Sequence, residues 1–342
     1  MACDWRSAAI LVQVSEGMLG LFCNWLSSVR HTLQIRNDIF VALHGSNLEP
    51  VRQSLAALGI AREHVLEGNA SVHARTMGNF GGGSFYALNT AKITYALDLL
   101  ERKNRPIIFS DIDVVWLRDP LAHLARALDR QAAFAIGPDA NDKLLRTSEG
   151  ASQALTQRHH VCACFFAACP SAAWLLRDWR SAASPAVGAG GAAAGAINEQ
   201  KAFQRLLDRR PDLVLRGNRT GTIPTSPPPR GGGSPHERNN FRHEAVVAIL
   251  DPAHFPTGQK DPPIAPSHVW LHANWIQRRT RASTTTAKKL RLQKRGVVEP
   301  ELCIVRLAVQ SQMNSLRCNF SFLVHGLRES MGGSRRRRAA AP

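Results

Sequence analysis

Residues 107–120 read IIFSDIDVVWLRDP and carry the strongest local signal in the sequence. An apolar strand runs directly into Asp111 and Asp113, and a second apolar run follows. Carboxylates at the end of a buried strand cost free energy unless a positive group binds them. Two aspartates one residue apart can share one divalent cation, with waters and substrate phosphates as the other ligands. The alternative interpretation is a strand-end turn in which Asp111 caps a following helix.

The segments before this strand alternate between strand-like and helix-like patterns. Residues 8–14 and 39–43 are short apolar runs that predict strands. Residues 19–33, 48–58 and 90–100 carry apolar residues at helical spacing. This order is typical of βαβ units and predicts an α/β fold with a mostly parallel central sheet. Such sheets bind ligands at the carboxyl ends of their strands, which is where the two aspartates lie.

The second half of the chain continues with weaker patterns. Strands are predicted over residues 161–167, 245–250 and 269–273, and helices over residues 172–179 and 200–207. The patterns therefore predict one α/β domain that extends well past the aspartate pair.

Length and composition set the domain organisation. The chain has 342 residues, of which 44% are hydrophobic, and this is enough for one large domain with a sizeable core. We expect that domain over residues 8–300, an extension of uncertain structure over residues 301–330, and a disordered basic tail over residues 331–342. No apolar run has the roughly 20 residues that a membrane span needs, and we expect neither a membrane span nor a signal peptide in this chain.

The net charge of +17 is compatible with a polyanionic partner, an acidic membrane surface or an anionic substrate such as a nucleotide. The excess lies mainly in residues 278–295 and in the tail. No nucleic-acid-binding module is recognised, so we expect no nucleic-acid partner.

The phrase SDIDVVWLRDP closely resembles the metal-binding strand of the plant and algal nucleotide-diphospho-sugar transferases, glycosyltransferase family 77. Three further segments occur in the order found in that family: Asn24-Trp25-Leu26, Lys92 and His272-Ala273-Asn274. The resemblance therefore covers roughly residues 10–274. It implies a GT-A-like, Rossmann-like fold, a UDP-sugar donor, Mn²⁺ or Mg²⁺ as cofactor, and retention of the anomeric configuration. It also implies that the protein acts in the Golgi lumen, although we recognise no signal or transmembrane anchor in this sequence.

The resemblance assigns a metal site. Asp111 and Asp113 look like the pair that holds the cation and the donor's ribose and diphosphate. His272 resembles the third ligand, and an imidazole suits Mn²⁺ at such a site. The alternative for His272 is a structural hydrogen-bonding residue.

Three further residues are candidates for donor binding. Lys92 resembles a residue that reaches the donor, with a solvated helix lysine as the alternative. Asn274 follows the metal-ligand candidate by two positions, and Lys288 could neutralise the leaving diphosphate.

Asn198-Glu199-Gln200 precedes a predicted helix and resembles the Asp-Gln pair beneath the sugar ring of retaining transferases. Glu199 and Gln200 are therefore the candidate catalytic residues, which would orient the sugar or stabilise positive charge at the anomeric carbon. Helix capping is the competing account, with Asn198 as N-cap and Glu199 in the first turn. Both accounts remain open at this point.

One strand departs from the family pattern. Where the family has Asn-x-Gly-Phe, this chain has Cys162-Ala163-Cys164-Phe165. The strand normally lies against the donor sugar, which makes Cys162 a further donor-binding candidate. The spacing of Cys162, Cys164 and Cys169 is not that of common zinc sites, and no fourth ligand is evident. We therefore expect three buried free thiols.

Together these observations predict a metal-dependent, retaining glycosyltransferase that moves a sugar from a UDP-sugar to a glycan or glycoprotein acceptor. A catalytically degenerate homologue that only binds nucleotide or glycan is the alternative, suggested by the two cysteines. A basic nucleic-acid-binding protein is a weaker alternative, suggested by the charge alone.

Overall fold

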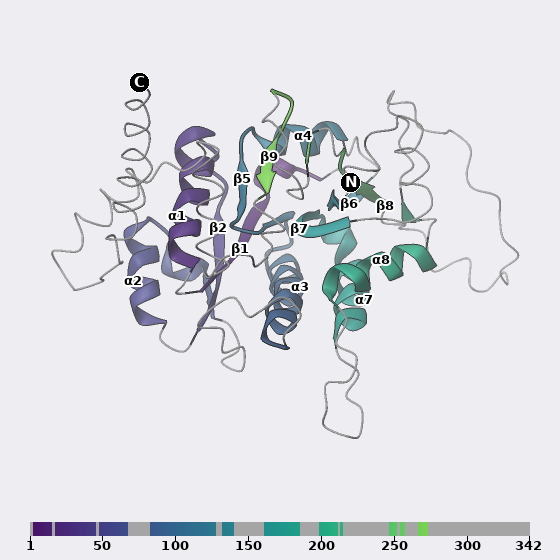
Figure 1. Cartoon of the computed structure of the whole chain (residues 1–342), viewed down its shortest axis with the longest axis horizontal. Coiled ribbons are helices and arrows are strands. Elements are labelled where there is room, and N and C mark those ends of the chain that lie inside the picture. The colour runs from purple at the N-terminus through teal and green to yellow at the C-terminus, as the bar shows by residue number, and fades with distance from the viewer. Residues whose placement is uncertain are drawn as a thin grey trace, which may run out of the picture.

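The structure is a computed structural model that describes residues 3–15, 18–45, 48–67, 83–127, 132–139, 161–184, 198–210, 213–214, 246–251, 254–256 and 266–272. A seven-stranded sheet forms its centre, with helices on both faces (Figure 1). The expected extension, the basic tail, Asn274 and Lys288 lie outside the described residues, so the domain boundary at residue 300 stays a prediction.

The strand order of the large sheet is β3-β2-β1-β4-β7-β6-β8. Its members are β1 (Ala9–Ser15), β2 (Ile39–His44), β3 (Val65–Glu67), β4 (Ile107–Ser110), β6 (Ala132–Pro138), β7 (Val161–Ala168) and β8 (Val246–Ile249). Among the described pairings all are parallel except those of β7, which runs antiparallel to both β4 and β6. The predicted α/β fold with a mostly parallel central sheet is therefore confirmed.

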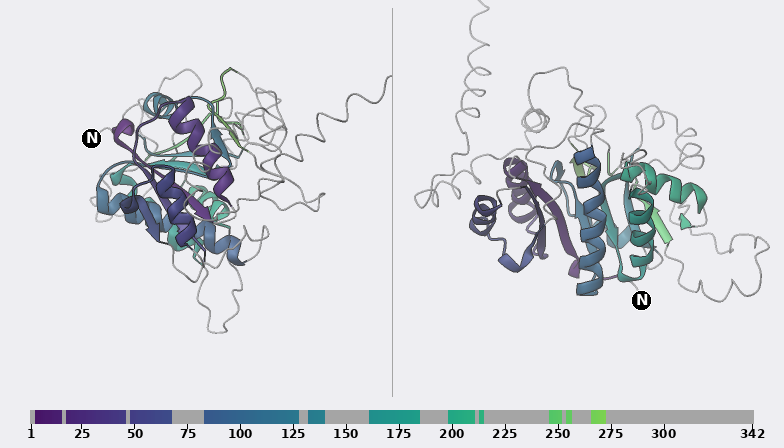
Figure 2. Two further views of the ribbon diagram at one scale, coloured as in Figure 1. Left: turned by 90° about the vertical axis from the view of Figure 1, so that its left-hand side faces the viewer. Right: turned by 90° about the horizontal axis from the view of Figure 1, so that it is seen from below.

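Two layers of helices cover the sheet, as the rotated views show (Figure 2). One core joins the sheet to α1 (Leu19–Ser27), α2 (Glu49–Ala57) and α4 (Pro120–Ala127). The other core joins it to α3 (Gly83–Lys103), α7 (Ala173–Ala183) and α8 (Glu199–Arg209). Along β1, Ile10 and Val12 face the first core, whereas Ala9 and Leu11 face the second. Both faces are buried, which explains why the strands read as continuous apolar runs.

Several elements differ from the predictions. The helix predicted over residues 19–33 is α1 followed by a π-helical turn over Ser28–Thr32, and α3 extends beyond both ends of its predicted range. Gly59 has φ +80°, as expected for the residue that ends α2. The patterns do not predict β3, β6 or α4. Strand β6 reads AAFAIGP, and its alanines, glycine and proline have low strand propensity.

A second sheet lies beside the large one and consists of β5 (Val114–Trp116) and β9 (Trp270–His272), which pair antiparallel. The register places Val114 opposite His272. This pairing brings a segment from late in the chain against the residues that follow the aspartate pair (Figure 1).

A disulfide joins Cys3, before β1, to Cys169, after β7, with the two Cα atoms 6.0 Å apart. The prediction of a free thiol at Cys169 is therefore wrong. Its partner lies 166 positions earlier in the sequence, and no local spacing indicates that pairing. No helix of the described part of the chain is at once long and apolar enough to cross a bilayer.

We expect replacement of both cysteines, Cys3→Ser with Cys169→Ser, to lower the free energy of unfolding by about 2–4 kcal/mol, because the bond closes a very long loop in the unfolded chain. Urea denaturation of the two proteins measures this difference. Dithiothreitol should destabilise the wild type and leave the double variant unchanged. Coincident unfolding curves for oxidised wild type and variant would contradict a stabilising role.

Candidate functional site

A tight turn follows β4 and carries the two aspartates. The N–H of Asp111 donates to the carbonyl of Cys164 at 2.7 Å, and the N–H of Val114 donates to the carbonyl of Asp111 at 3.1 Å. Strand β5 follows this turn directly, so Asp111 does not cap a helix. Asp119 is the residue that caps α4, since its Oδ1 accepts from the N–H of Leu121 at 2.8 Å.

His272 lies beside these aspartates because β9 pairs with β5. The His272 Nε2 atom is 3.7 Å from Asp113 Oδ1, and the two side chains are only 5% and 6% exposed. Asp111, Asp113 and His272 each offer a ligand atom, and these atoms lie within 4.8 Å of one another. The structure therefore brings together the three residues that the sequence proposed as metal ligands.

These three candidate ligands fit a divalent cation of the expected kind. Two carboxylates and one imidazole suit Mn²⁺, whereas Mg²⁺ favours oxygen ligands and would rely more on the carboxylates. A cation would also offset the cost of keeping the Asp113 carboxylate away from water. The ion-binding role itself stays a prediction.

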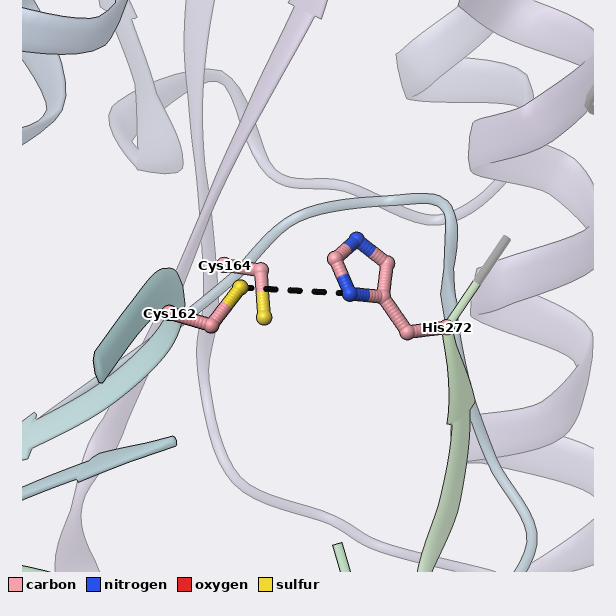
Figure 3. Close-up of side chains that lie close together, drawn as sticks. All are labelled: Cys162, Cys164 and His272. Atoms are coloured by element: carbon pink, nitrogen blue, oxygen red, sulfur yellow. Dashed lines mark hydrogen bonds between the residues drawn. The ribbon is translucent and has the colours of Figure 1, made fainter. Parts of the chain in front are cut away.

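The two cysteines of β7 face the same imidazole from another side (Figure 3). Cys162 Sγ is 3.9 Å from His272 Nδ1, and Cys164 lies beside it; both thiols are buried and neither is in a disulfide. The register between β6 and β7 shifts here, since Ile136 pairs with Phe166 whereas Gly137 pairs with Cys162. The alternation of β7 is interrupted just after the two cysteines, where the consecutive residues Cys164 and Phe165 both face the first core.

The two thiols have different acidities. The hydrogen bond from Cys164 lowers the pKa of Cys162 to about 6, against the effect of burial, and His272 acts in the same direction. Burial raises the pKa of Cys164 well above its usual value, and the neighbouring Cys162, Asp111 and Asp113 raise it further. The pair thus has one acidic and one weakly acidic thiol.

Lys92 is fully buried on α3 and forms an ion pair with Glu199, at 3.1 Å between Nζ and Oε1. Its ammonium also donates to the carbonyl of Ala163 at 2.9 Å and lies 5.2 Å from the centre of the Phe109 ring. Burial by itself would lower the pKa of Lys92, but Glu199 and then Asp111 outweigh it and raise that pKa. The alternative of a solvated helix lysine is therefore wrong.

Helix α8 begins with the Asn198-Glu199-Gln200 segment, and the capping account holds for Asn198. Its Oδ1 accepts from the N–H of Gln200 at 2.8 Å and of Lys201 at 3.3 Å. Glu199 is 5% exposed, and within the described residues its Oε2 has no hydrogen-bond partner. Gln200 Nε2 donates to Asp139 Oδ2 at 2.7 Å. Capping by Asn198 thus leaves the Glu199 carboxylate directed into the protein.

Sequence reasoning missed two participants. Asp139, which follows β6 and holds Gln200, carries no signal in the sequence because β6 itself is not predicted. Cys164 does carry one, since it lies two positions after Cys162 on a strand and the two side chains therefore share a face. Asn274 and Lys288 lie outside the described residues, and their donor-binding roles stay predictions.

Comparison with known proteins gives one family. A family model described as nucleotide-diphospho-sugar transferase matches residues 53–287. No curated protein sequence matches the chain.

Solved structures that resemble the chain include apo mouse xyloside xylosyltransferase 1 (TM-score 0.35, 12% identity, covering 60% of this chain and 82% of that one). Another is a glycosyltransferase involved in glycosylation of the major capsid of PBCV-1 (TM-score 0.38, 8% identity, covering 84% of this chain and 98% of that one). A third is the galactosyltransferase LgtC in complex with donor and acceptor sugar analogs (TM-score 0.39, 10% identity, covering 85% of this chain and 96% of that one).

Proposed function

Because the chain belongs to the nucleotide-diphospho-sugar transferase family, whose model matches residues 53–287, we propose that it is a metal-dependent, retaining glycosyltransferase. Family membership makes it an enzyme of sugar transfer with a GT-A-like fold. Our proposal adds a UDP-sugar as donor, a glycan or glycoprotein as acceptor, and Mn²⁺ as cofactor.

The observation that carries this proposal is the meeting of Asp111, Asp113 and His272 at the end of β4. A cation bound there would neutralise the charge that develops on the diphosphate as it leaves. The two carboxylates and the imidazole come from a turn and a paired strand rather than from a long loop, so their positions are fixed before substrate arrives.

The residues of α8 support the sugar side of the reaction. In retaining transfer the bond from the anomeric carbon to the diphosphate breaks, a bond to the acceptor oxygen forms on the same face, and the acceptor proton leaves with the phosphate. The Glu199 Oε2 atom, with no hydrogen-bond partner in the described part, could accept from a sugar hydroxyl or face the positive anomeric carbon. Lys92 and Asp139 hold Glu199 and Gln200 respectively in place for that role.

The disulfide supports a location in the secretory pathway. Disulfides persist in oxidising compartments and are rare in the cytosol. The bond between Cys3 and Cys169 is thus compatible with the Golgi lumen, which we propose as the site of action.

A donor screen tests the function. The purified protein is incubated with UDP-xylose, UDP-arabinose, UDP-galactose and UDP-glucose, each with Mn²⁺ and with EDTA, and release of UDP is followed. We expect Mn²⁺-dependent release with at least one donor, loss in EDTA, and recovery when Mn²⁺ is added in excess. When a sugar acceptor is added, NMR of the glycoside that forms should show the anomeric configuration of the donor.

The same experiment separates the alternatives. Full activity in EDTA would contradict metal dependence, and an inverted product would contradict retention. Binding of UDP without turnover of any donor would favour the degenerate binding homologue.

A further inference from the structure

The His272 imidazole lies between two different sets of ligand atoms. Its Nε2 faces Asp113 Oδ1 at 3.7 Å, and its Nδ1 faces Cys162 Sγ at 3.9 Å. Asp111 lies with Asp113 on the first side, and Cys164 lies with Cys162 on the second. The proposed transferase reaction uses the carboxylate side and gives the thiol side no role as a set of metal ligands.

The thiol side has the dimensions of a zinc site. Ligand atoms of Cys162, Cys164 and His272 lie within 4.8 Å of one another, and all three residues are buried. Tetrahedral zinc with bonds of about 2.3 Å to sulfur and about 2.0 Å to nitrogen separates those two atoms by about 3.5 Å. The observed 3.9 Å between Cys162 Sγ and His272 Nδ1 therefore needs only a small closure.

We propose that Cys162, Cys164 and His272 Nδ1 form a second cation site, selective for Zn²⁺, and that its occupation excludes the cation of the aspartate site. Two sulfur ligands and an imidazole select a soft or borderline ion such as Zn²⁺, whereas the carboxylate side selects a hard one. Binding displaces the two thiol protons to solvent. Three protein ligands leave a fourth coordination position for water.

The exclusion follows from the chemistry of the ring. A neutral imidazole offers one nitrogen lone pair to a metal, while the other nitrogen carries a proton. When Nδ1 binds zinc, Nε2–H donates to Asp113, which is the carboxylate–histidine–zinc arrangement that commonly orients a ligating histidine. When Nε2 binds the hard cation, Nδ1–H points at Cys162. One ring therefore serves one site at a time.

Inhibition of the enzyme by zinc rests on the proposed metal-dependent transfer, whereas the binding of zinc does not depend on that proposal. Zinc should inhibit sugar transfer in the presence of Mn²⁺, because it removes His272 from the Mn²⁺ ligands. The two statements are tested by separate measurements, so that failure of either can be recognised.

Binding is measured first, with Co²⁺ as a spectroscopic substitute for zinc. All proteins carry Cys303→Ser and Cys318→Ser, so that thiols outside the described residues do not contribute. We expect one equivalent of Co²⁺ to give the near-ultraviolet absorption of a thiolate–cobalt bond, and one equivalent of Zn²⁺ to abolish it.

The variants assign that absorption. Cys164→Ser and Cys162→Ser should each weaken Co²⁺ binding at least about tenfold, because even the loss of a partner that orients a ligand weakens metal binding by that much. Cys23→Ser makes the same change at a buried thiol on α1 and should have no effect on binding. Circular dichroism establishes that each variant is folded. Cobalt bound without thiolate absorption, or equal absorption in folded Cys164→Ser, would overturn the site.

Activity is measured second, and each variant is compared with its own rate without zinc. We expect Zn²⁺ to inhibit the parent protein, and Cys164→Ser to need at least about tenfold more zinc for half inhibition, in line with its weaker binding. Equal inhibition of parent and Cys164→Ser would overturn the exclusion. A parent protein that binds Co²⁺ through its thiols but transfers no sugar would refute the proposed function and leave the zinc site standing.

Discussion

Asp113→Asn should reduce sugar transfer on the order of a thousandfold, and the protein should remain folded. Asp113 is buried beside His272, and it faces the ring nitrogen that points toward the carboxylates. Asparagine keeps the shape of the side chain but removes the charge that a divalent cation needs. Loss of one anionic ligand removes several kcal/mol of transition-state stabilisation, which is the origin of the expected factor. Initial rates at saturating donor and Mn²⁺ measure the effect.

Asp98→Asn is the matched control, because it removes the same charge from an exposed position on α3, where Asp98 pairs with Arg102. An exposed ion pair contributes little to stability, so this variant should have wild-type rates and unfolding. If Asp113→Asn and Asp98→Asn have equal rates, the proposed cation site is wrong. If Asp113→Asn unfolds, its lost activity does not test the cation site. In that case Mn²⁺ binding is measured for folded Asp111→Asn, and binding as tight as that of the wild type would contradict the site.

Lys92→Met should lower the free energy of unfolding by about 3–5 kcal/mol, the usual effect of removing one partner from a buried ion pair. The side chains of Lys92 and Glu199 are 1% and 5% exposed, and their charges lie 3.1 Å apart. Without the ammonium the Glu199 carboxylate stays buried with no compensating charge, and the carbonyl of Ala163 loses its donor. Urea denaturation measures the change.

The double variant Lys92→Met/Glu199→Gln tests the reason for that loss. It removes both charges, so it should be more stable than Lys92→Met alone. Glu101→Gln, which breaks the exposed pair with Arg177, is the control and should cost no more than about 1 kcal/mol. A Lys92→Met variant as stable as Glu101→Gln would show that the buried ion pair contributes no more to the free energy of unfolding than an exposed one.

The central fold could be predicted because its strands and helices follow simple periods. Apolar runs of strand length alternate with helical spacing up to residue 110, and this order indicates a parallel sheet. The reversed direction of β7 could not be predicted, since a buried strand has the same pattern whichever way it runs. The strand over residues 269–273 is predicted, but its pairing with β5 is not, because two strands of three residues each carry no pattern that identifies a partner.

The aspartate pair and the family resemblance predict the candidate metal ligands, whereas the burial of the charged pair Lys92 and Glu199 is harder to predict. Lys92 is a donor-binding candidate by resemblance, but its residue type does not predict its burial, because lysine is rarely buried. A signal was present, because Lys92 lies four positions after Leu88 and four before Ala96, both buried, and so belongs to the apolar face of α3. The burial of Glu199 had no such signal, since it depends on Lys92 from a different helix.

The pairing of β5 with β9 has a consequence for biosynthesis. The aspartates leave the ribosome long before His272, and chains begin to fold from the N-terminus during synthesis. Strands β1, β2 and β4 can therefore associate while the imidazole has not yet been made. A nascent chain that stops after α8 contains the carboxylates and the thiols but not the imidazole that lies between them in the complete fold. Both candidate cation sites are completed only when translation has passed residue 272, because the imidazole of His272 belongs to each of them.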